Sequence, residues 1–314
     1  MVSDLSNACS KSPPDSPRSD NVRCLVIGGT GMLGHKLVQV LQNDLDVWAT
    51  VRRSLDEIER FGIFERSQTI ESLDVLDTKA LRSSIDLTKP DVVVNAIGVV
   101  KQQYGADPGE MLSLNADLPH TLASMSKDLG FRLITISTDC VFSGSKGSYR
   151  EIDRPDAIDI YGKSKLKGEV TDPNCLTLRT SMIGRELDTC HSLVEWMLAH
   201  RNKEVRGYVN AIFSGFPTIC LAQTIAAVIT DHPALTGVYH VSSEAISKYD
   251  LLKLINEEYD ANIRIIADNS VRIDRSLNSD RFQAQTGIKP ASWPDMICQM
   301  ADDPTPYDRF HLAA

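Results

Sequence analysis

The sequence of 314 residues lacks the features that mark membrane-spanning, disulfide-bonded and nucleic-acid-binding proteins. No apolar stretch approaches the ~20 residues that a helix needs to span a bilayer. The seven cysteines are scattered and include no Cys-x-x-Cys pair, which favours reduced thiols, a cytoplasmic location and no metal site. The net charge is −9, and no basic run contains interleaved aromatic residues. Nucleic acid and anionic membrane surfaces are therefore not expected as partners.

Residues 1–21 also lack the material for a hydrophobic core. They are rich in Ser, Pro and Asp and contain no apolar segment of the kind found in signal peptides, so we expect a disordered tail. From Val22 onward, short apolar runs alternate with helical patterns, as buried parallel strands and their connecting helices do. Strands are expected in VRCLVI (22–27), DVWATV (46–51), DVVVN (91–95), FRLITIST (131–138), LTLRT (176–180) and GVYHV (237–241).

This alternation predicts an α/β fold: a doubly wound parallel sheet of the Rossmann type with a smaller C-terminal lobe. We assign residues 22–183 and 216–242 to the dinucleotide-binding domain and residues 184–215 and 243–303 to a substrate-binding lobe. The apolar strand near Gly237 is the reason for the split, because its surroundings are charged and it should return to the main sheet.

The first predicted strand ends in GGTGMLG, which places glycines at positions 28, 31 and 34 before a helical pattern. Glycine permits a tight turn and close approach of a diphosphate, and the helix N-terminus offers N–H groups to that anion. A glycine-rich turn that serves only close packing is the alternative. The strand–turn–helix context favours a nucleotide site. The residues expected to bind the cofactor here are Gly28, Thr30, Gly31, Met32, Leu33 and Gly34.

The end of the second strand indicates which cofactor is preferred. An acidic residue there would accept a hydrogen bond from the ribose of NAD, whereas this sequence has Arg52 and Arg53. Two guanidinium groups suit a 2′-phosphate, so NADP(H) is favoured over NAD(H), with solvated arginines as the alternative. Asp74 and Val75 follow the next expected strand and could flank the adenine.

Tyr161 and Lys165 lie four residues apart in DIYGKSKLKGE and should share one helix face. A phenol with a pKa of about 10 is a poor acid at neutral pH, and a neighbouring ammonium would lower that pKa. Thr138, at the carboxyl end of a predicted strand, could hold a substrate carbonyl beside them. Such a pair is also common on surface helices, but its order after the glycine loop and Thr138 favours catalysis.

These motifs together resemble the extended short-chain dehydrogenase/reductases, and more closely the dTDP-4-dehydrorhamnose reductase (RmlD-like) branch. The resemblance rests on GGTGMLG, NAIG at 95–98, SLNADLP at 113–119, STDCVFSG at 137–144, YGKSKLKGE and LRTSMIG at 178–184. NAIFSGFPT at 210–218 and GVYHVSS extend it into the C-terminal half.

The resemblance implies a role for each matching residue. Tyr161 would protonate the alkoxide while a hydride arrives from the nicotinamide, Lys165 would bind the ribose, and Thr138 would orient the sugar carbonyl. Further cofactor contacts are implied at Asn95, Ala96, Ile97, Gly98, Asn115 and Thr180. Substrate contacts are implied at Asp139, Met182, Asn210, Phe213, Ser214 and Arg275.

One departure from that branch leaves the substrate broad. Met182 stands where rhamnose-forming reductases usually carry a tryptophan, so the expected substrate is a nucleotide-linked 4-keto-6-deoxy sugar on dTDP or UDP. Two alternatives stay open: a nucleotide-sugar epimerase, and a non-catalytic NADP-binding subunit like that of methionine adenosyltransferase, which keeps the same motifs. The oligomeric state is also open, with a homodimer among the possibilities.

Overall fold

A computed structural model describes residues 21–99 and 107–312. The predicted tail, except Asn21, therefore lies outside the described residues. The centre of the molecule is a seven-stranded sheet in the order β10-β6-β5-β4-β1-β2-β3, and every strand pairing in it is parallel. Its strands are β1 (Arg23–Ile27), β2 (Asp46–Thr50), β3 (Thr69–Ile70), β4 (Val92–Asn95), β5 (Arg132–Thr138), β6 (Cys175–Thr180) and β10 (Gly237–His240).

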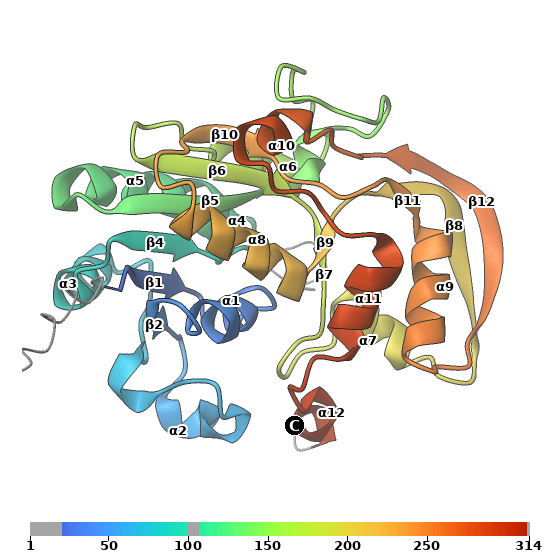
Figure 1. The fold of residues 1–314 in the computed structure, drawn as a ribbon, viewed down its shortest axis with the longest axis horizontal. Coiled ribbons are helices and arrows are strands. Elements are labelled where there is room, and N and C mark those ends of the chain that lie inside the picture. Colours follow the sequence, from blue (N-terminus) through green and yellow to red (C-terminus); the bar gives the residue numbers. More distant parts are fainter. Residues whose placement is uncertain (1–20, 100–106, 313–314) are drawn as a thin grey trace, which may run out of the picture.

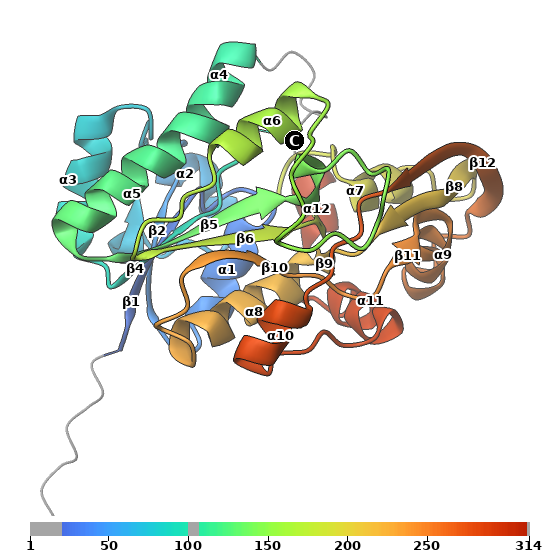
Figure 2. The same ribbon diagram turned by 90° about the horizontal axis from the view of Figure 1, so that it is seen from above.

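Helices cover both faces of this sheet, which confirms the predicted doubly wound α/β class (Figure 1). Figure 2 shows α3, α5 and α6 on one face and α1 and α8 on the other. The central strands β1, β4, β5 and β6 are buried on both sides, so their sequences are nearly continuous apolar runs rather than alternating ones. The helices are α1 (Gly34–Leu41), α3 (Thr78–Thr88), α4 (Pro108–Leu112), α5 (Leu118–Leu129), α6 (Ile160–Lys167) and α8 (Thr218–Thr230), with a π-helical segment η3 (Ser113–Asp117) joining α4 to α5.

A second group of elements lies beside the carboxyl edge of the sheet (Figure 1). A three-stranded sheet in the order β11-β8-β12 packs against α9, and a two-stranded pair, β7-β9, connects it with the central sheet. These elements are β7 (Met182–Ile183), α7 (Leu193–Leu198), β8 (Glu204–Phe213), β9 (Phe216–Pro217), β11 (Ile246–Ser247), α9 (Lys248–Glu258), β12 (Arg264–Asp274), α10 (Asp280–Thr286), α11 (Trp293–Ala301) and α12 (Tyr307–Leu312). The short elements α2 (Leu55–Ile58), η1 (Glu59–Phe61), η2 (Arg66–Gln68) and η4 (Asp139–Val141) complete the described chain.

The chain returns to the central sheet between the two halves of this lobe. β10 pairs with β6 in parallel, and α8 packs on α1, as expected from the apolar run near Gly237. The lobe boundaries at residues 184–215 and 243–303 remain an interpretation, and α12 lies beyond the second stretch. Within the described ranges, no helix has both the length and the apolar character that crossing a membrane requires.

The first turn of α1 packs so closely on the glycine loop that Gly34 has no room for a side chain. A Cβ at Gly34 would lie 2.0 Å from the carbonyl oxygen of Gly28, whereas one at Gly31 would lie 3.3 Å from the same atom. The loop therefore needs glycine at position 34 for packing, independently of any ligand.

We predict that Gly34→Ala lowers the free energy of unfolding by about 2 kcal/mol, because the clash outweighs the helix propensity that alanine adds. Gly31→Ala is the matched control, since a shift of a few tenths of an ångström relieves its contact. Urea unfolding of the three proteins without ligand measures the difference. Equal midpoints for Gly34→Ala and the unmodified protein would contradict the packing argument.

Candidate active site

The carboxyl ends of the central strands bring most of the predicted site residues to one edge of the sheet. Ile27 of β1 is paired with Asn95 of β4, and Thr138 of β5 with Thr180 of β6. The strand order reverses between β1 and β4, and ligands of open α/β sheets bind at such a switch point. The glycine loop follows β1 directly and therefore lies at this point.

The glycine loop has the backbone of a tight turn. Gly28 has a φ of +88°, which favours glycine, and a Cβ there would also lie 2.6 Å from the side chain of Ile97. Two backbone hydrogen bonds close the loop, from Gly29 N to Thr50 O and from Gly31 N to Gly28 O. Leu33, the N-cap of α1, provides no side-chain cap, so this helix end suits an external anion.

Helix α6, which carries the Tyr–Lys pair, is held by contacts that only glycine permits. A Cβ at Gly162 would lie 2.1 Å from the carbonyl oxygen of Cys140, and one at Gly168 would lie 2.0 Å from that of Asn115. Asp159 caps the helix by accepting a hydrogen bond from Gly162 N at 2.8 Å. The backbone of α6 is thereby fixed against η4 and η3 near both of its ends.

Asn115 connects three segments of the site from its buried position in η3. Its side-chain amide accepts a hydrogen bond from Val99 N at 2.9 Å and donates to Val99 O at 2.9 Å and to the Ser164 hydroxyl at 3.1 Å. The structure therefore places Asn115 as the link between the strand-end segment after β4 and α6. π-Helical turns such as η3 are rare and frequently occur at functional sites.

Tyr161 and Thr138 lie within hydrogen-bonding distance of each other at the carboxyl edge of the sheet. Burial raises the pKa of Tyr161 above its ordinary value, and a hydrogen bond with the Thr138 side chain opposes this effect only in part. The net direction is opposite to the lowering expected from Lys165, because desolvation by burial dominates the pKa of Tyr161. The phenol therefore keeps its proton at neutral pH, as a general acid must.

Lys165 is a buried cation without a neutralising contact. Within the described residues its ammonium makes no hydrogen bond or ion pair, although only 8% of the residue is exposed. A Cβ at Gly98 would lie 3.7 Å from the Lys165 nitrogen and from the Asn115 amide oxygen, so the ammonium faces the loop after β4. Burial lowers the pKa of Lys165 to about 8, with Glu169 opposing the shift.

A buried polar network behind α6 was not predicted from the sequence. Arg179 of β6 donates to both carboxylate oxygens of Glu169, at 2.8 and 2.7 Å, and the Ser137 hydroxyl donates to the same carboxylate at 2.6 Å. Arg179 also donates to His240 Nε2 at 3.2 Å. The four-residue spacing from Lys165 to Glu169 was the one feature of the sequence that could have indicated this network. The Glu169 carboxylate is the charge that opposes the lowering of the Lys165 pKa.

Arg275 lies beside this site rather than in an exposed loop. Its guanidinium donates to Phe142 O at 2.9 Å and to Cys140 Sγ at 3.5 Å, and it lies 3.8 Å from the Asp159 carboxylate. These contacts connect β12 with the chain after β5. Asp139 is buried, which raises its pKa, and burial raises the pKa of Cys140 to about 12, so this thiol is not a nucleophile.

The two arginines after β2 have different surroundings. The side chain of Arg52 is 87% exposed and its nearest ion-pair partner is Glu110 at 3.9 Å. Arg53 instead pairs with Asp188 at 2.5 Å and lies over the ring of Phe61. The structure therefore leaves Arg52 more accessible to a phosphate than Arg53.

The remaining predicted residues divide into edge and core positions. Thr180 is buried at the end of β6, and Val75 packs with the sheet core. Asn95 accepts a hydrogen bond from Ile97 N, and Asp74 accepts one from Leu76 N.

The predicted substrate residues of the lobe differ in burial. Phe213 is a core residue that contacts Trp293, and Ser214 is buried and accepts a hydrogen bond from Leu277 N. Met182 is partly buried, whereas Asn210 is exposed and donates to Asn269.

The fold and this edge define a dinucleotide-binding α/β protein with a Thr–Tyr–Lys constellation. A family model for the RmlD substrate binding domain matches residues 22–305, so the chain belongs to this family. The resemblance seen in the sequence is thereby confirmed.

The similar proteins include relatives of two kinds. The chain is 27% identical to a dTDP-4-dehydrorhamnose reductase of Aggregatibacter actinomycetemcomitans, over 86% of this chain and 95% of that protein. It is 25% identical to methionine adenosyltransferase 2 subunit beta of Bos taurus, over 88% and 89% of the two chains. The solved dTDP-4-dehydrorhamnose reductase of Bacillus anthracis, in complex with NADP, has the same fold: the TM-score is 0.72 at 21% identity, over 89% of this chain and 98% of that one.

The buried Lys165 generates a pH-dependent stability that can be measured without ligand. Its pKa of about 8 in the fold lies below 10.5, so between these values the unfolded chain binds more protons and stability rises with pH. We predict that Lys165→Met raises the free energy of unfolding at pH 7 by on the order of 2 kcal/mol, because each pKa unit corresponds to about 1.4 kcal/mol.

Lys163→Met, on an exposed position of the same helix, is the matched control. Urea unfolding at pH 7 and pH 10 should show the gain of Lys165→Met shrinking as the pH rises, while the control changes little at either pH. A loss of stability in Lys165→Met at pH 7 would show that the ammonium has a stabilising partner.

Proposed function

We propose that this protein is an NADPH-dependent reductase of a nucleotide-linked 4-keto-6-deoxy sugar. The observation that carries the proposal is the cluster at the sheet edge: a protonated Tyr161 beside Thr138, and a largely buried Lys165 whose ammonium has no partner among the described residues. A largely buried charge with no partner among the described residues costs the fold free energy, and a ligand with hydroxyl groups would supply hydrogen bonds to it.

The residues present fit a dinucleotide. The glycine loop and the uncapped start of α1 would hold the diphosphate, and Arg52 would contact a 2′-phosphate. The space at Gly98 would admit the ribose next to Lys165, because this residue has no side chain. Asn95–Gly98 and Thr180, at adjacent strand ends, would line the remainder of the cofactor.

The chain's own residues would act on the substrate carbonyl. NADPH, when bound, supplies the hydride. Thr138 orients the carbonyl by a hydrogen bond, and the Tyr161 hydroxyl transfers its proton to the oxygen as negative charge develops there. The high pKa of Tyr161 keeps the proton in place until the more basic alkoxide forms. Lys165, four residues along the same helix, would stabilise the tyrosinate that remains, because opposite charges on one helix face attract strongly in a largely buried site.

The substrate class rests on the reductase relatives together with the lobe beside the sheet edge. Asp139, Met182, Asn210, Phe213, Ser214 and Arg275 are the substrate-contact candidates. Among them, Phe213 and Ser214 are better suited to shaping the lobe than to direct contact, since both are buried in it. The six free cysteines among the described residues suit a reducing compartment such as the cytoplasm, and a homodimer is compatible with this function.

A second candidate is a non-catalytic, NADP-binding subunit. The relationship with methionine adenosyltransferase 2 subunit beta favours it, because that protein matches this chain over a similar length and at a similar identity. Both candidates need the glycine loop and Lys165 for the cofactor. Only the reductase needs the proton of Tyr161.

We therefore predict that Tyr161→Phe lowers kcat by 10²–10⁴, the usual contribution of general acid catalysis, and changes NADPH affinity little. Fluorescence titration gives the affinity, and turnover is followed with NADPH and dTDP- or UDP-linked 4-keto-6-deoxy sugars. Full activity in Tyr161→Phe would remove Tyr161 from the mechanism. No turnover of any such sugar by an unmodified protein that binds NADPH would favour the subunit.

The cofactor preference gives a separate prediction. Arg52→Ala should lower the affinity for NADPH at least tenfold and leave NADH unchanged, because a charge-assisted contact contributes roughly 1.5–3 kcal/mol. Arg53→Ala should have the smaller effect, since Asp188 already neutralises Arg53. Equal affinities for NADPH and NADH in the unmodified protein would contradict the assignment of Arg52.

A further inference from the structure

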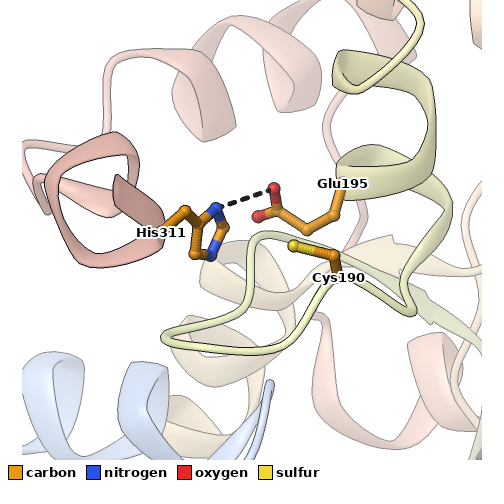
Figure 3. Close-up of side chains that lie close together, drawn as sticks. All are labelled: Cys190, Glu195 and His311. Carbon is orange, nitrogen blue, oxygen red and sulfur yellow. Dashed lines mark ion pairs between the residues drawn. The ribbon is translucent and has the colours of Figure 1, made fainter. Parts of the chain in front are cut away.

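Three side chains with metal-binding atoms meet on the lobe, away from the catalytic pair. Figure 3 shows Cys190, Glu195 and His311 pointing toward one another from the loop before α7, from α7 and from α12. The thiol sulfur, one carboxylate oxygen and one imidazole nitrogen all lie within 4.8 Å of one another. His311 Nδ1 is 3.5 Å from Glu195 Oε2.

Supporting contacts orient two of these three atoms. Glu195 Oε1 accepts hydrogen bonds from Arg185 Nε at 2.6 Å and from Glu186 N at 3.0 Å, which leaves Oε2 facing His311. His311 Nε2 donates to the carbonyl oxygen of Glu186 at 2.9 Å. In the neutral imidazole this bond leaves the lone pair on Nδ1, the atom that faces Glu195, and metal-binding histidines are commonly oriented in this way.

We propose that Cys190 Sγ, Glu195 Oε2 and His311 Nδ1 bind one zinc ion, with water as the fourth ligand. Tetrahedral zinc with bonds of about 2.0–2.3 Å separates its ligand atoms by about 3.3–3.6 Å. The His311–Glu195 separation already falls in this range, and Cys190, which is exposed, needs to move by roughly 1 Å. A thiolate and an imidazole favour zinc over the harder ions magnesium and calcium.

The charges around the cluster are compatible with a divalent cation. Binding releases the thiol proton to solvent, so the ligands contribute two negative charges. Arg185 is the nearest cation and opposes the metal, but it also pairs with Asp308 at 2.6 Å. Glu186 adds a further carboxylate on the same loop, bonded to the backbone of His191 and Ser192.

Zinc at this position would connect the C-terminal helix to the loop at residues 184–192. That loop also carries Asp188, the partner of Arg53 at the end of β2. The ion would therefore stabilise a region that reaches toward the proposed cofactor site without supplying a group to the reaction. Its effect is expected on stability rather than on the chemical step.

The test uses the full chain, with any affinity tag removed, stripped of metal by a chelator. Titration with zinc, followed by native mass spectrometry, should show one ion per chain, and bound zinc should raise the Tm. Cobalt should give the near-ultraviolet charge-transfer band of a thiolate–cobalt bond and the visible bands of a tetrahedral site.

Cys190→Ser and His311→Gln should each reduce zinc affinity at least tenfold and abolish the rise in Tm, and Cys190→Ser should also remove the thiolate band. Cys298→Ser and His120→Gln, which change the same residue types elsewhere, should bind as the unmodified protein does. The Tm of each variant without metal shows whether it is folded. Absence of stoichiometric zinc in the unmodified protein, or unchanged binding in folded Cys190→Ser and His311→Gln, would overturn the proposal. Both results are independent of NADPH and sugar turnover.

Discussion

The site depends on the close approach of α6 to the backbone around it. Gly162 and Gly168 meet the carbonyl oxygens of Cys140 and Asn115 at distances that exclude any side chain. Because the helix cannot move away without losing these contacts, the side chains of α6 have fixed positions relative to η4 and η3. Tyr161 directly precedes Gly162, so the contact of Gly162 with Cys140 also helps to hold Tyr161 beside Thr138.

The same close packing creates an electrostatic cost. It places Lys165 in a largely buried position where no described residue pairs with its ammonium, and it buries the Tyr161 phenol so that the proton is retained. The network of Glu169, Arg179 and Ser137 lies behind the helix and keeps one negative charge in reach of the lysine. The fold thus tolerates a destabilising cation where a ligand would compensate it, which is typical of functional sites.

The sequence predicted the features that follow from local periodicity and turn chemistry. The apolar runs predicted the sheet, including the return of β10, and the glycine spacing predicted the loop after β1. It did not predict that Arg53 pairs with Asp188 or that Arg275 packs on Phe142 O, because these contacts join segments more than a hundred residues apart. It also gave the wrong direction for the Tyr161 pKa, since spacing reveals a neighbouring charge but not the degree of burial.

Nothing in the sequence indicated the cluster of Cys190, Glu195 and His311 either, for the same reason: its residues come together only in the fold. No ligand spacing in the sequence marks it, because α12 brings His311 back to α7 from the end of the described chain (Figure 3). Arg185 and Glu186 connect this cluster with the loop, and Asp188 on that loop reaches Arg53. One short loop therefore joins the C-terminal helix to the cofactor-side strand end. A change that loosens α12 should consequently alter the surroundings of Arg53 before it alters those of Tyr161, whose position depends on contacts within the central sheet domain.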